Sequence, residues 1–91
     1  MAVSNPLKSD TRNVLNIHDS AFDELITYQI VLKNRATCFT IKVDVEDVSF
    51  CDNNAKFTFL LPCIPTGNYK VQIINQADSS VIYDDISAIV Y

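Results

Sequence analysis

Apolar and polar side chains alternate with a period of two residues in several segments after residue 24. Such alternation predicts β-strands with one buried face and one solvent-facing face. Asn, Asp, Ser and Pro separate the segments, and these residues favour turns for different stereochemical reasons. The positions that we expect to point inward are Ile26, Tyr28, Ile30, Leu32, Phe39, Ile41, Val43, Val45, Phe57, Phe59, Leu61, Tyr69, Val71 and Ile73.

The segment between residues 61 and 69 narrows the choice of β fold. Gly67 comes two residues before Tyr69, which opens a strand-like segment. Glycine permits a positive φ where the chain changes sheets, and the tyrosine could then bury its ring while its hydroxyl donates to an upstream carbonyl, forming a tyrosine corner. The alternative is a turn glycine followed by an ordinary strand tyrosine. With about seven short strands, we predict an all-β, immunoglobulin-like β-sandwich in which Gly67 and Tyr69 determine the corner.

The first 20 residues are polar and interrupted by Pro6, and we interpret them as an extended N-terminal arm that carries one short strand. The sandwich domain would then cover residues 21–91. Deleting residues 1–12 is expected to leave the fold intact. Apolar side chains on a polar segment or at a chain end are candidate contacts with another protein. These candidates are Val14, Leu15 and Ile17 in the arm, with Ile89 and Tyr91 either completing the core or pairing at a sheet edge.

Size and charge exclude several classes of protein. The 91 residues suit one domain. The net charge of −4 opposes binding to nucleic acid, and no apolar stretch approaches the ~20 residues that cross a bilayer. No secretion signal is evident, so we expect the protein to work in the compartment where it is made. Without such a signal, the three cysteines are expected to be reduced thiols.

Residues with catalytic or metal-binding chemistry are few and poorly placed. His18 is the only histidine, and no nucleophile or oxyanion site accompanies it in the pattern. Asp44 and Glu46 alternate along a strand, as on any solvated sheet face, and lack calcium-loop spacing. A single glycine excludes a phosphate-binding loop. We therefore predict no enzyme, no metal and no cofactor.

One family resemblance adds to this interpretation. The pattern F-T-F-L-L-P…P-T-G-N-Y-K-V-Q-I-I-N-Q…V-I-Y-D-D-I…I-V, preceded by F-T-I-K-V-D-V, covers roughly residues 24–91. It resembles the small immunoglobulin-like auxiliary capsid and head-fibre-associated structural proteins of tailed, crAss-like bacteriophages. Fibronectin-III and bacterial surface immunoglobulin-like domains share its Gly-x-Tyr motif. The hairpin at residues 75–80 departs from the family pattern because it lacks a glycine, which leaves its turn type open.

The resemblance implies a virion structural protein, made in the host cytoplasm and located on the capsid surface. It would be an auxiliary (decoration) protein, present in many copies and bound to the major capsid protein and to a head-fibre protein. The alternative is a cell-surface or cytoplasmic immunoglobulin-like module that binds protein or carbohydrate. Tryptophan, a frequent sugar-binding platform, is absent. No contact with nucleic acid or membrane is expected in either case.

Overall fold

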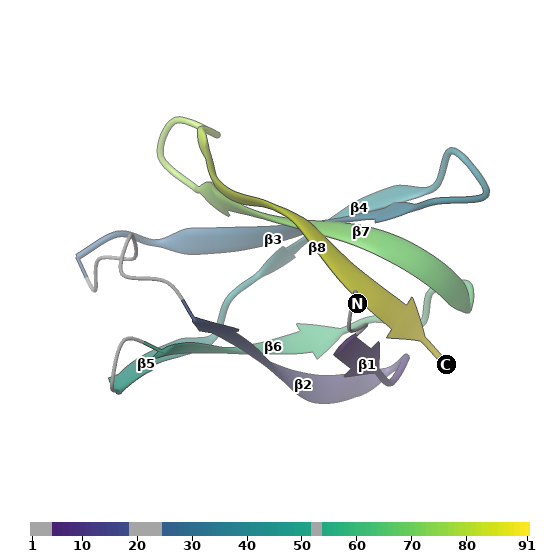
Figure 1. Ribbon diagram of the computed structural model, residues 1–91, viewed down its shortest axis with the longest axis horizontal. Helices are drawn as coiled ribbons and strands as arrows, with labels where there is room; N and C mark the ends of the chain where they lie inside the picture. The colour runs from purple at the N-terminus through teal and green to yellow at the C-terminus, as the bar shows by residue number, and fades with distance from the viewer. Residues whose placement is uncertain (1–4, 19–24, 52–53) are drawn as a thin grey trace.

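The strands of this chain form two β-sheets that face each other, as the ribbon in Figure 1 shows. The computed structural model describes residues 5–18, 25–51 and 54–91, and within these ranges it contains eight strands and no helix. The predicted all-β sandwich is confirmed. The strands are β1 (Asn5–Leu7), β2 (Thr11–His18), β3 (Tyr28–Asn34), β4 (Thr40–Asp44), β5 (Asp47–Cys51), β6 (Asn54–Leu61), β7 (Gly67–Asn75) and β8 (Val81–Val90).

The order of the strands is immunoglobulin-like. One sheet has the order β1-β8-β7-β3-β4 and the other has the order β2-β6-β5. All neighbouring pairs are antiparallel except β1 and β8, which are parallel. In immunoglobulin notation, β2-β6-β5 corresponds to strands B-E-D, and β8-β7-β3-β4 corresponds to G-F-C-C′.

The N-terminal segment belongs to the sandwich. β1 pairs with the end of β8, and β2 pairs with the whole of β6, from Thr11 opposite Leu61 to His18 opposite Asn54. Leu7 in β1 is only 1% exposed, so removing residues 1–12 would take a core side chain with it, contrary to our expectation. We expected an arm here because the segment is polar on average. A strand with one solvent-facing side also contains many polar residues, so average polarity does not distinguish the two. The predicted domain boundary at residue 20 lies outside the described residues.

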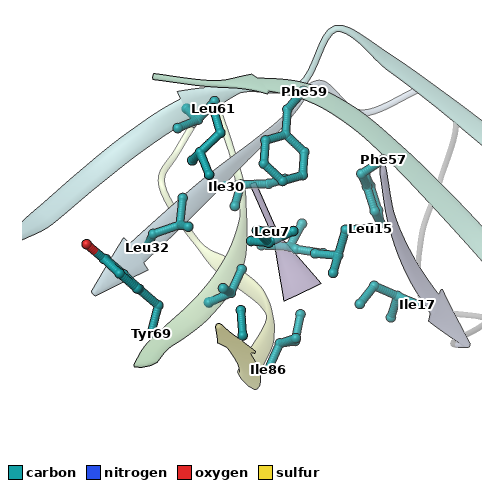
Figure 2. Close-up of a cluster of buried hydrophobic side chains, with 14 of the residues drawn as sticks. Leu7, Leu15, Ile17, Ile30, Leu32, Phe57, Phe59, Leu61, Tyr69 and Ile86 are labelled. Carbon is teal, nitrogen blue, oxygen red and sulfur yellow. The ribbon is translucent and has the colours of Figure 1, made fainter. Parts of the chain in front are cut away.

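The core fills the space between the two sheets, as Figure 2 shows for the side chains around Leu7, Leu15 and Phe57. Most of the predicted inward positions are buried, and Ile26, Ile41 and Val45 pack against the core while partly exposed. Phe39 is the exception at 36% exposure, because it precedes β4 at the sheet margin. The predicted inward residues that the structure buries are Tyr28, Ile30, Leu32, Val43, Phe57, Phe59, Leu61, Tyr69, Val71 and Ile73.

The hairpin between β7 and β8 turns without glycine. Ser79 has a φ of 62°, in the left-handed region that most residues avoid. Side-chain acceptors stabilise the turn: Asn75 Oδ1 accepts the Ala77 N–H at 2.9 Å, and Asp78 Oδ1 accepts the Ser80 N–H at 3.0 Å. Asn and Asp therefore supply locally the hydrogen bonds that hold this turn.

Candidate interaction surface

The three arm candidates divide between the surface and the core. Val14 is 53% exposed on the outer face of β2, whereas Leu15 and Ile17 are only 1% and 5% exposed. The proposed contact role of Leu15 and Ile17 is therefore corrected: both side chains serve the core of the folded chain. The physical reason is the two-residue period of a strand, which sends residues 15 and 17 inward when residue 14 points outward.

The C-terminal candidates divide in the same way. Ile89 and Tyr91 are 42% and 61% exposed, while Ala88 and Val90 on either side of Ile89 are buried. Two backbone bonds hold the end of the chain in place: the Tyr91 N–H donates to Leu7 O at 3.0 Å, and the Ser9 N–H donates to Tyr91 O at 3.1 Å. The end of β8 thus contributes alternately to the core and to the surface.

Sequence analysis missed a further exposed apolar residue, Leu60. It is 53% exposed in β6 and lies opposite Arg12, while Val14 lies opposite Thr58. Val14 and Leu60 are therefore diagonal neighbours on adjacent strands, a spacing of roughly 7–8 Å that large side chains can span. We call these two residues the Val14–Leu60 patch. The signal in the sequence was an apolar residue in the outward phase of the strand, between the inward Phe59 and Leu61.

An ion pair borders this patch. The Arg12 guanidinium on β2 reaches across β6 to Glu46, with Nη2 3.0 Å from Oε2 and Nε 3.3 Å from the same oxygen. The two side chains are 62% and 40% exposed. An exposed pair of this kind contributes at most about 1 kcal/mol to stability, so its main effect is to place a neutralised polar rim beside the apolar side chains.

The outer face of the five-stranded sheet has a different character. Gln29 Nε2 donates to Asp44 Oδ1 at 2.8 Å, and Gln72 Nε2 donates to Asp84 Oδ1 at 2.9 Å. Lys70 Nζ lies 3.5 Å from the same Asp84 oxygen. Polar side chains here bond to one another across the strands, so the two outer faces of the sandwich offer different surfaces to a partner.

Among the residues considered for chemistry, His18 on β2 and Cys51 on β5 lie opposite the same residue, Asn54, on the two sides of β6. His18 ends β2, where its ring Nδ1 is 2.8 Å from Asn54 Oδ1. Cys38 and Cys63 are exposed free thiols, and the side chain of Cys51 lies outside the described part of the structure. Within residues 5–18, 25–51 and 54–91, no three His, Cys, Asp or Glu side chains are grouped so that they could hold a metal ion. No helix in these ranges is long and apolar enough to span a membrane.

Comparison with known proteins yields only a distant structural likeness. No family model matches the chain, and no curated protein matches it in sequence. The crystal structure of a candidate glycoside hydrolase from Bacteroides vulgatus ATCC 8482 is similar at a TM-score of 0.45 and 10% identity. The match covers 97% of this chain and 17% of that one, so this chain corresponds to a small part of the other protein. A likeness at this level assigns no activity.

Proposed function

We propose that this protein is an auxiliary (decoration) protein of a tailed-phage head, which binds the major capsid protein through the outer face of its three-stranded sheet. The observation that carries the proposal is the Val14–Leu60 patch, in which two half-exposed apolar side chains lie diagonally on adjacent strands. The sequence resemblance over residues 24–91 supplies the identity of the partner. Exposed apolar side chains that lie together are typical of surfaces that bind other proteins.

The size of the patch limits what one contact can contribute. Burying the exposed half of a valine and a leucine stabilises a complex by roughly 1.5–3 kcal/mol in total. A single contact of this kind is weak, whereas a capsid lattice offers many equivalent positions and can retain its decoration when each contact is modest. The Arg12–Glu46 pair would fix orientation at the rim more than it adds affinity.

A second surface could then face outward or sideways on the particle. Ile89 lies near the end of β8 and Tyr91 directly follows that strand, which belongs to the five-stranded sheet rather than to the sheet that carries the patch. We assign this end of the sandwich to a neighbouring head-fibre protein. An acidic net charge of −4 would keep unassembled copies soluble until they reach the shell.

The test is co-sedimentation of the purified chain with heads assembled from a crAss-like phage major capsid protein. We expect the wild type to sediment with the heads in many copies, and Leu60→Lys to bind markedly less. Val81→Lys is the matched control because Val81 is equally exposed, at 53%, on the other sheet. Absence of wild-type binding, or equal loss in both variants, would contradict the proposal. An image of decorated heads would then show which face contacts the shell.

A further inference from the structure

The two sheets have four edge strands, and three of these edges are protected. β1 has only three residues and contains Pro6, β4 ends at Asp44, and β5 begins with Asp47. Short length, proline and charge are the usual means by which proteins prevent unwanted strand pairing. Each of these edges is thus a poor template for another strand.

The fourth edge, β2, is the least protected. It runs for eight residues, Thr11–His18, without proline or glycine, and its single formal charge is on Arg12, near one end of the strand. Its register with β6 is continuous from end to end, so no bulge twists the edge away. An edge of this length presents a row of backbone N–H and C=O groups that another strand can use.

The topology explains why this edge is open. In immunoglobulin sandwiches the sheet that contains strands B, E and D also contains strand A, which pairs with B. Here the N-terminal strand β1 pairs with β8 in the opposite sheet, and among the described residues β2 pairs with β6 alone. Among residues 5–18, 25–51 and 54–91, no strand therefore takes the position of strand A beside β2.

We propose that a second copy of this chain occupies that position, with the two β2 strands antiparallel about a two-fold axis at Val14. The two three-stranded sheets then join into one continuous sheet of six strands. Because residues directly opposite in an antiparallel pair share a face, only registers that pair even with even residues keep both cores on one side. In this register Val14 faces Val14 of the second copy, and Arg12 faces Asn16.

Outward side chains select this register over its nearest competitor. Centring the pair on Leu15 instead would place Arg12 opposite His18 and Val14 opposite Asn16, which pairs an apolar side chain with a polar one. Centring on Val14 joins the two Val14–Leu60 patches into one apolar stripe across four strands. The inward side chains favour neither of these two registers strongly, because Leu15 and Ile17 are already buried within each copy.

The charges on β2 permit self-association. Arg12 is the only residue of β2 that carries a formal charge at neutral pH, and it faces the neutral Asn16 of the other copy. No like charges oppose each other within the strand pair. A single strand pair buries less than the ~1,200 Å² of a standard stable interface, so the dimer should be reversible and should appear as concentration rises. It forms without a capsid and is independent of the proposed function.

The experiment is analytical ultracentrifugation of the full chain across a wide concentration range. We expect a monomer–dimer equilibrium whose dissociation constant Val14→Lys raises about tenfold or more, because two lysines would then face each other. Val81→Lys should leave the constant unchanged, since Val81 has the same 53% exposure but lies in β8. Thermal unfolding of each variant confirms that it is folded.

Variants at Asn16 test the register. Asn16→Asp should strengthen the dimer through two symmetric contacts with Arg12, and Asn16→Lys should weaken it by like-charge repulsion. A wild type that stays monomeric at every concentration would overturn the proposal, as would Val14→Lys dimerising normally. Growth beyond the dimer would also overturn the proposal, because a two-fold pair of β2 strands closes at two copies. Asn16 variants that do not differ would overturn the register centred on Val14.

Discussion

Tyr69 donates its phenolic hydroxyl to the carbonyl oxygen of Pro65 across 2.6 Å, while its ring is fully buried. This bond ties the start of β7 to the connection that crosses from the three-stranded to the five-stranded sheet. Phe39 meets the same ring edge-on, with centroids 6.5 Å apart. Both the apolar body and the polar tip of Tyr69 are therefore satisfied at the point where the chain changes layers.

Removing only this hydroxyl should destabilise the domain measurably. We expect Tyr69→Phe to lower the free energy of unfolding by about 1–1.5 kcal/mol, because the ring stays buried while one hydrogen bond is lost. Urea denaturation measures the difference. Tyr91→Phe is the control, since Tyr91 is 61% exposed. Equal stability of Tyr69→Phe and wild type would show that the corner bond contributes nothing.

Gly67 should resist replacement for a backbone reason. Its φ is +140°, and a Cβ placed there would lie 3.5 Å from Asn34 Nδ2, an ordinary contact distance. The cost of Gly67→Ala therefore comes from the backbone conformation, and we expect a loss of about 1–3 kcal/mol in unfolding free energy. If Gly67→Ala unfolds at the wild-type urea concentration, the φ at this position is not needed for the fold.

Leu7 tests whether the N-terminal segment is part of the folded domain. The side chain is 1% exposed in the core, so Leu7→Ala should lower the free energy of unfolding by about 2–5 kcal/mol. Pro6→Ala provides the control, because Pro6 is an exposed neighbour in the same strand. Denaturation curves of Leu7→Ala that overlay the wild type would instead support a dispensable arm.

Asp78 gives the β7–β8 hairpin a pH dependence. The Ser80 N–H and the Ser80 hydroxyl, 3.0 and 2.7 Å from Asp78 Oδ1, lower the pKa of this carboxyl below its ordinary value of 3.8. These bonds favour the ionised form, so their contribution is full above pH 3.8 and is lost as pH falls through the lower pKa of the folded state.

The Ser80 amide resonance should report this titration. We expect its NMR chemical shift to move with a midpoint below pH 3.8, and Asp78→Asn to abolish that movement because an amide does not titrate in this range. A midpoint at or above the ordinary value in the wild type would show that the two Ser80 bonds do not favour the carboxylate.

The contact candidates show which surface residues the sequence pattern can predict and which it cannot. Val14, Leu15 and Ile17 look alike as apolar residues in a polar segment, and only the strand phase distinguishes the exposed Val14 from its two buried neighbours. Leu60 was visible in the pattern as an apolar residue in the outward phase, but its proximity to Val14 depends on the register between β2 and β6. Register is set by the packing of both strands against the core, which no local pattern contains.

Alternation of side chains, determined by the sequence itself, was sufficient to predict an all-β sandwich and most of its core, because the two-residue period of a strand is a local property of the backbone. Tertiary structure alone decided that the N-terminal segment supplies β1 and β2, one to each sheet. It thereby also decided that β2 has one side without a described partner strand. These outcomes depend on long-range pairing between residues that are far apart in the chain, such as Leu7 with Val90.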